Sequence, residues 1–185
     1  MSDVRAGWSG YAGVAAAVAV VVTLVVLGWA ERDRFVAAEA GADAPAFTAV
    51  DLAGDSVRLA DYEGQVVMLN FWATWCPPCL EEMPSMQRLY DELRDDGFVV
   101  LAVSLDAPPP GQDVRELVGE YVDRLELTFP ILLDPEGVVE EAYNVSGLPT
   151  TYVIDRDGRI DGKVIGGRHW DAAEYRDRIV RLLEG

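Results

Sequence analysis

The sequence predicts an α/β fold with a mixed central sheet flanked by helices, on three observations. Two apolar runs, residues 65–71 and 98–105, have the continuous hydrophobic pattern of strands buried on both faces. A helical pattern over residues 79–93 lies between them and completes a βαβ unit with parallel strands. Residues 151–165 have the pattern of a hairpin. A hairpin beside a βαβ unit makes the sheet mixed.

Turn signals and periodicity predict the remaining elements. An Ala-Gly-Asp turn at residues 53–55 separates two short strand patterns, which predicts an N-terminal hairpin over residues 47–59. We further expect a helix over 112–126, a short strand over 129–133, a short helix over 137–143 and an amphipathic helix over 170–183.

An uncharged apolar segment, residues 10–30, precedes this domain. About 20 apolar residues span the ~30 Å core of a bilayer, and Trp8, Tyr11 and Trp29 lie at its ends, where such rings favour the membrane interface. A cleaved signal peptide, for which the run is long, and a buried core helix are the alternatives. We predict an N-terminal tail over 1–9, one transmembrane anchor over 10–30, a tether over 31–42 and a domain over 43–185.

The composition is strongly acidic. The formal net charge is −17, and Lys163 is the single lysine. Such a charge argues against nucleic acid or an anionic membrane surface as a ligand. The acidic residues are scattered, which indicates a solvated surface; a high-salt environment, where the self-repulsion of that surface is screened, is the alternative.

The two cysteines of the chain, Cys76 and Cys79, stand together where the first buried strand meets the following helix. A helix N-terminus favours the thiolate, which is the nucleophile of disulfide exchange. We expect Cys76 to be the exposed attacking thiol and Cys79 the partly buried thiol that resolves a mixed disulfide. Pro77 and Pro78 between them remove two backbone donors and stiffen the turn.

Other uses of this pair fit less well. A structural disulfide would close a very small loop and stabilise the fold little. A zinc site needs about four ligands, whereas the chain offers two cysteines and the distant His169. The spacing therefore favours exchange chemistry.

Residues 70–79, Asn-Phe-Trp-Ala-Thr-Trp-Cys-Pro-Pro-Cys, resemble the membrane-anchored thioredoxin-like proteins of the TlpA/ResA type. Residues 44–47, Ala-Pro-Ala-Phe, and 147–155, Gly-Leu-Pro-Thr-Thr-Tyr-Val-Ile-Asp, share the resemblance, which covers residues 43–183 in the expected order. It implies a thioredoxin fold with an N-terminal β-hairpin and an inserted helical segment over 106–128.

The resemblance also implies a function. The chain would be a thiol–disulfide oxidoreductase that works as a reductase through the Cys76–Cys79 disulfide, with no other cofactor. Its partners would be exported disulfide-containing proteins, such as apocytochrome c, and a polytopic membrane protein that donates electrons by thiol transfer. On this ground we expect a single-pass protein of the cell membrane whose soluble domain lies on the extracytoplasmic side.

The family pattern marks further residues around the cysteines. Pro149 matches a cis-proline that faces the pair, which would leave the backbone of Leu148 free to pair with an extended substrate, with Thr150 beside it. The alternative is a trans proline that opens an edge strand. Trp75 is expected to be exposed at the site, and Trp72 to lie in the core.

Glu82 follows Cys79 by one helical turn, so its carboxylate can reach the pair. A partly buried carboxylate with a raised pKa suits the base that takes the proton of the resolving thiol. In thioredoxin a buried aspartate on the preceding strand does this; here that position is Asn70, which cannot ionise, whereas the ResA-type pattern has a functional glutamate at position 82. A solvated acid in the first helical turn is the alternative.

Three points stay open. A thiol peroxidase wants Thr-x-x-Cys, whereas Thr74 lies two residues before Cys76. A copper-binding assembly factor of the Sco type wants Cys-x-x-x-Cys and a histidine in the substrate loop, whereas the spacing is one residue short and His169 lies well beyond Pro149. The proline loop over 108–110 either borders the substrate groove or is only a stiff connector.

Overall fold

The computed structural model describes residues 18, 20–23, 40–107 and 110–185. The chain divides between residues 36 and 37, and the fold below is that of the second unit. In the part of the chain that is described, no helix is long and apolar enough to cross a membrane. Apart from residues 18 and 20–23, which are helical, the predicted anchor over 10–30 lies outside the described residues and stays a prediction.

The described domain is built on a mixed sheet of seven strands in the order β2-β1-β5-β4-β3-β6-β7. β3, β4 and β5 pair in parallel, and the other neighbours pair antiparallel. The predicted mixed sheet and N-terminal hairpin are therefore confirmed. The strands are β1 (Thr48–Asp51), β2 (Ser56–Arg58), β3 (Val66–Trp72), β4 (Phe98–Ser104), β5 (Ile131–Leu133), β6 (Thr150–Ile154) and β7 (Ile160–Ile165).

Helices connect these strands close to the predicted places. They are the 3₁₀ helices η2 (Leu59–Tyr62) and η3 (Arg94–Asp96), and the α-helices α2 (Pro77–Leu93), α3 (Val114–Arg124), α4 (Val138–Ala142) and α5 (Ala173–Glu184). The last of these begins three residues later than the periodicity suggests. Trp170 is held against α2, since its backbone N–H donates to Ser85 Oγ at 2.9 Å, so it does not join α5.

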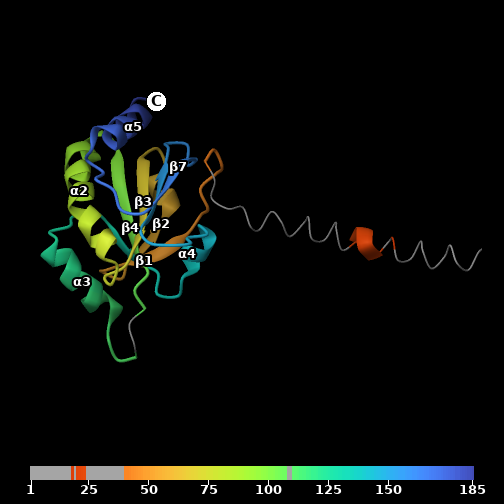
Figure 1. The fold of residues 1–185 in the computed structure, drawn as a ribbon, viewed down its shortest axis with the longest axis horizontal. Coiled ribbons are helices and arrows are strands. Elements are labelled where there is room, and N and C mark those ends of the chain that lie inside the picture. Colours follow the sequence, from red (N-terminus) through yellow and green to blue (C-terminus); the bar gives the residue numbers. More distant parts are fainter. Residues whose placement is uncertain (1–17, 19, 24–39, 108–109) are drawn as a thin grey trace, which may run out of the picture. The chain divides into compact units, whose positions relative to one another are not determined.

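The side chains of β3 and β4 alternate between two cores. On one face Met68 and Val100 join a cluster with residues of α2, α3 and α5, and on the other Leu69 and Leu101 join a cluster with Tyr143 and residues of α4 and β6. Figure 1 shows α2 and α5 on the side of the sheet opposite α4. Because both faces are covered, β3 and β4 are apolar throughout except at Asn70 and Ser104, which are buried.

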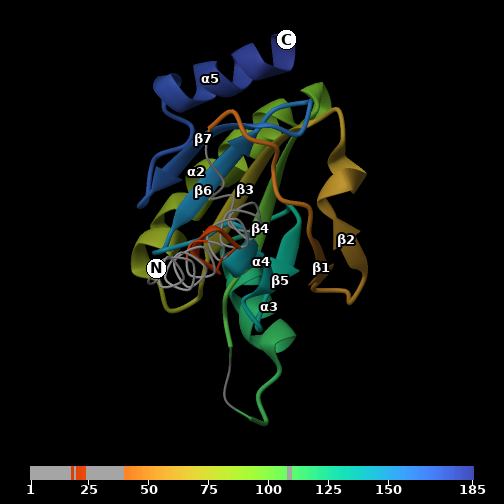
Figure 2. The same cartoon turned by 90° about the vertical axis from the view of Figure 1, so that its right-hand side faces the viewer.

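The parallel strands β3 and β4 end at the same edge of the sheet. The backbone N–H of Leu105, just after β4, donates to the carbonyl oxygen of Trp72, the last residue of β3, at 2.9 Å. The cysteine turn leaves β3 here, and the segment that leads to α3 leaves β4. Figures 1 and 2 both show α3 at the end of the domain away from α5. Pro108 and Pro109 lie outside the described residues, so whether the proline loop over 108–110 borders the substrate groove or is a stiff connector stays open.

Leu101 tests the packing of the central sheet, because its side chain is fully buried in β4. We expect Leu101→Ala to lower the free energy of unfolding by about 2–5 kcal/mol, measured by denaturant titration. The control is Val138→Ala at a position that is 63% exposed, where a change within about 0.5 kcal/mol is expected. Equal losses in the two variants would contradict this packing.

Candidate active site

The cysteine pair forms a disulfide at the start of α2. Cys76 and Cys79 have Cα atoms 5.3 Å apart, with Cys76 at the N-cap position and Cys79 in the first turn, as the spacing predicted. Pro77 and Pro78 occupy the first two helical positions, where a missing backbone N–H leaves no helical bond unmade. Two prolines therefore start the helix without weakening it.

The two cysteine residues differ less in solvent exposure than the sequence predicted. Cys76 is 5% exposed and Cys79 is fully buried, so the predicted order holds but an openly exposed Cys76 is wrong. Trp75 beside it is 67% exposed, whereas Trp72 is fully buried, which confirms both tryptophan predictions.

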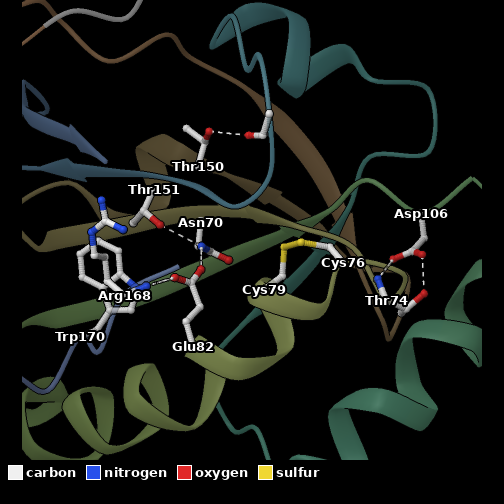
Figure 3. Close-up of a disulfide and its surroundings, with 11 residues drawn as sticks. Asn70, Thr74, Cys76, Cys79, Glu82, Asp106, Thr150, Thr151, Arg168 and Trp170 are labelled. Carbon is white, nitrogen blue, oxygen red and sulfur yellow. Dashed lines mark hydrogen bonds between the residues drawn. A yellow bond between two sulfur atoms is a disulfide. The ribbon is translucent and has the colours of Figure 1, made fainter. Parts of the chain in front are cut away.

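A buried carboxylate fixes the turn before Cys76. Asp106 accepts hydrogen bonds from the Thr74 backbone N–H at 2.9 Å and from Thr74 Oγ1 at 2.6 Å (Figure 3). It also accepts one from Ser104 Oγ at 2.8 Å. Sequence reasoning missed this cluster. Its signal was a serine and an aspartate at the end of an otherwise apolar strand. The consequence is a rigid approach from β3 to Cys76.

Pro149 lies next to the cysteine turn, and the Leu148–Pro149 peptide bond is cis, as predicted. Thr150 pairs with Phe71 in the antiparallel register of β6 and β3, so Pro149, which precedes Thr150, lies toward the end of β3 where the cysteine turn begins. Thr150 Oγ1 donates to the Gly147 carbonyl oxygen at 2.7 Å. Leu148 is half-buried, and its part in substrate binding stays a prediction.

Glu82 is buried, with 2% exposure, more deeply than the sequence suggested. Its Oε1 accepts a bond from Asn70 Nδ2 at 2.9 Å. Its Oε2 accepts bonds from the backbone N–H of Arg168 and from Trp170 Nε1, each at 3.0 Å. Figure 3 shows these groups converging on the carboxylate from β3 and from the loop before α5. Trp170 and Arg168 carry no sequence signal, because their proximity depends on the fold.

Burial raises the pKa of Glu82 to about 7, against the opposing hydrogen bonds from Trp170, Arg168 and Asn70, which lower it. Loss of hydration disfavours the charged form of a carboxylate, whereas donors favour it. The balance leaves a carboxyl group that exchanges its proton near neutral pH. The predicted raised pKa is thus confirmed, and its chemical role is taken up below.

Asn70 stands between Glu82 and the disulfide. Besides the bond to Glu82, its Nδ2 donates to Thr151 Oγ1 at 2.9 Å, across the β3–β6 pairing. Its Oδ1 is buried and has no hydrogen-bond partner among the described residues. From the sequence, Asn70 is recognisable only as a side chain that cannot ionise.

An open pocket of about 160 Å³ gives solvent access to the Glu82 side of the site. Gly167 packs so closely there that an added Cβ would lie 3.0 Å from the Pro78 carbonyl oxygen. No group of three or more potential metal-binding His, Cys, Asp or Glu side chains occurs in the described part of the chain. His169, which the sequence analysis gave no role, is one of the lining residues: Pro78, Glu81, Glu82, Gly167, Arg168 and His169.

Comparisons with known proteins agree with this site. The AhpC/TSA family matches residues 40–163. The thiol-disulfide oxidoreductase ResA of Geobacillus kaustophilus is 39% identical over 150 residues, which cover 79% of this chain and 83% of that protein. ResA of Halalkalibacterium halodurans is 40% identical over 150 residues, with 79% and 82% covered.

Solved structures of thiol:disulfide interchange proteins have the same fold. A candidate thiol:disulfide interchange protein DsbE from Chlorobium tepidum superposes with a TM-score of 0.71 at 32% identity, over 78% of this chain and 98% of that one. A thiol:disulfide interchange protein from Bacteroides sp. gives 0.68 at 27% identity, over 80% and 93%. With its thioredoxin-like fold and its Cys76–Cys79 pair, this chain belongs to the AhpC/TSA family and is a thiol–disulfide oxidoreductase of the ResA kind.

Proposed function

We propose that the protein is a membrane-tethered reductase that opens disulfides of exported proteins, apocytochrome c among them. The observation that carries the proposal is the buried carboxyl group of Glu82, with a pKa of about 7, one helical turn beyond Cys79. A group with this pKa takes and returns a proton at neutral pH, which resolution of a mixed disulfide by a buried thiol requires.

The reaction proceeds in two exchanges. The Cys76 thiolate attacks a substrate disulfide, so that a Cys76–substrate bond forms and one substrate sulfur leaves as a thiolate. Cys79 then gives its proton to Glu82 and attacks Cys76 Sγ, which forms the Cys76–Cys79 disulfide and expels the second substrate sulfur. Two electrons reach the substrate. A dithiol on a polytopic membrane partner reduces the pair again.

Substitution of each cysteine tests this order of events. Cys76→Ser should abolish reduction of a model protein disulfide such as insulin, because no attacking thiolate remains. Cys79→Ser should retain the attack and accumulate mixed disulfides that non-reducing gels reveal. Mixed disulfides through Cys79 in the Cys76→Ser protein, and none through Cys76, would reverse the assigned roles.

The direction of electron flow has its own measurement. A reduction potential of the Cys76–Cys79 pair of about −270 mV or lower fits a reductase, whereas a value of about −120 mV would point to an oxidant. Tight stoichiometric copper binding by the reduced protein, without reductase activity, would instead favour the Sco-type alternative.

Glu82→Gln removes the group that titrates near neutral pH. We expect the rate of mixed-disulfide resolution in the wild type to rise as pH increases through about 7. The variant should lose this rise, and above pH 7 it should resolve the mixed disulfide about 10²-fold more slowly than the wild type. Stopped-flow measurement across pH follows this step. Glu81→Gln, at the exposed neighbouring position, is the matched control and should keep the wild-type profile.

Stability gives an independent check on the same group. Because the folded pKa of Glu82 is raised from 4.5 to about 7, its stabilising contribution is present below 4.5 and is lost as pH rises through 7. Relative to Glu82→Gln, the wild type should therefore lose about 3 kcal/mol of unfolding free energy across that window, at ~1.4 kcal/mol per pKa unit. A pH-independent difference would contradict the raised pKa.

The apolar run over residues 10–30 supports the tethering part of the proposal. We expect the full-length protein to sediment with membranes and to resist extraction by alkaline carbonate, and a variant lacking residues 10–30 to be released. A membrane-impermeant maleimide should label the reduced Cys76 of intact cells if the domain faces outward. Labelling only after lysis would contradict the orientation.

A further inference from the structure

Two buried polar atoms of β3, Asn70 Oδ1 and Trp72 Nε1, have no hydrogen-bond partner among the described residues, and Asn70 is the one that also contacts Glu82. Its side chain is fully buried, and its Oδ1 accepts no bond there. Leaving a buried acceptor unpaired costs free energy, and such an atom in a native core calls for a physical reason. The mechanism above does not use Asn70.

The orientation of this amide follows from its neighbours. Nδ2 donates both to Glu82 Oε1 and to Thr151 Oγ1, at 2.9 Å each. An ionised carboxylate accepts hydrogen bonds only, so the nitrogen must face Glu82. The carbonyl oxygen is thereby turned away from Glu82, and Figure 3 shows it pointing toward the disulfide on the Cys79 side.

Among the described residues no group donates to this oxygen, and Trp72 Nε1 on the same face of β3 is itself buried without a partner. Asn70 lies on the face of β3 that carries Met68 and Trp72, and these two residues belong to the apolar cluster that also contains Cys79. Cys79 and Glu82, one helical turn apart on α2, are both buried against this face. A disulfide sulfur carries no proton, whereas the reduced Cys79 carries one as an S–H group, which is a weak donor.

We propose that Asn70 is a catalytic residue of the redox cycle, whose Oδ1 accepts a hydrogen bond from the Cys79 thiol in the dithiol state. The inference rests on the thiol–disulfide chemistry of the pair and not on the direction of electron flow. One amide then contacts both partners of the proton transfer: its oxygen holds the thiol, and its N–H group holds the carboxylate that receives the proton.

This contact couples Asn70 to the redox equilibrium. When a donor dithiol reduces the pair, two electrons and two protons enter, the S–S bond breaks, the donor becomes a disulfide and Cys79 gains the S–H that completes the bonding of Oδ1. When Cys79 attacks, its proton goes to Glu82 and Oδ1 loses its donor again. Asn70 therefore favours the dithiol over the disulfide state.

The S–H stretching band of Cys79 tests the contact directly. In the full-length Cys76→Ser protein Cys79 is the only thiol. Its Raman S–H band should lie at the lower frequency of a hydrogen-bonded thiol, and adding Asn70→Leu should raise it to that of an unbonded thiol. The matched control is Thr151→Val, which removes the other partner of Nδ2 without touching Oδ1 and should leave the band in place.

In the protein with both cysteines, Asn70→Leu should lower the dithiol-to-disulfide equilibrium constant about threefold to tenfold, on the scale of one net hydrogen bond. This corresponds to ~15–30 mV toward more reducing potential, measured against a reference dithiol. An unchanged S–H band in Asn70→Leu, or an equilibrium constant that moves as much in Thr151→Val, would overturn the proposal.

A measurement without substitution at position 70 covers the case in which Asn70→Leu does not fold. Exchange of the Cys79 thiol proton for deuterium should shift the carbon-13 resonance of the Asn70 carboxamide in the reduced protein, and no shift would count against the contact. If the wild-type protein shows the hydrogen-bonded Cys79 thiol but does not reduce protein disulfides, the proposed function is contradicted and this inference about Asn70 still holds.

Discussion

The buried carboxylate of Glu82 is the interaction on which the rest of the site depends. Burial of a carboxylate is unfavourable unless donors surround it, and here the donors come from β3 and from the loop before α5. These hydrogen bonds join β3, α2 and the loop before α5 at the Glu82 carboxylate. It also explains why Trp170 stays in the loop instead of beginning the terminal helix.

Two polar clusters flank the disulfide in an otherwise apolar region. On the Cys79 side lie Asn70 and Glu82; on the Cys76 side Asp106 holds the turn through Thr74. Hydrogen-bonded polar groups in a core fix geometry more strictly than apolar packing does. The arrangement gives Cys76 a fixed approach from β3 and places a titrating carboxyl group one helical turn from Cys79.

The position of the acid gives Asn70 its part in this site. An ionisable group on the strand would contact the resolving thiol directly. Placing the acid on α2 leaves the strand position to a neutral amide, which can donate to the carboxylate and accept from a thiol at once. The proposed base, Glu82, and the amide that donates to it are therefore separate residues on separate elements.

The sequence alone determined the order of elements, the mixed sheet, the place of the cysteines at the start of a helix and the cis bond before Pro149. These follow from local patterns and from short motifs whose residues adjoin one another. Only the tertiary structure decided the low exposure of Cys76, the hydrogen bond between Asp106 and the Thr74 backbone, and the bonds that Arg168 and Trp170 donate to Glu82. Those contacts join residues that are 32 to 88 positions apart, and no local pattern encodes which distant backbone or indole N–H will meet a given carboxylate.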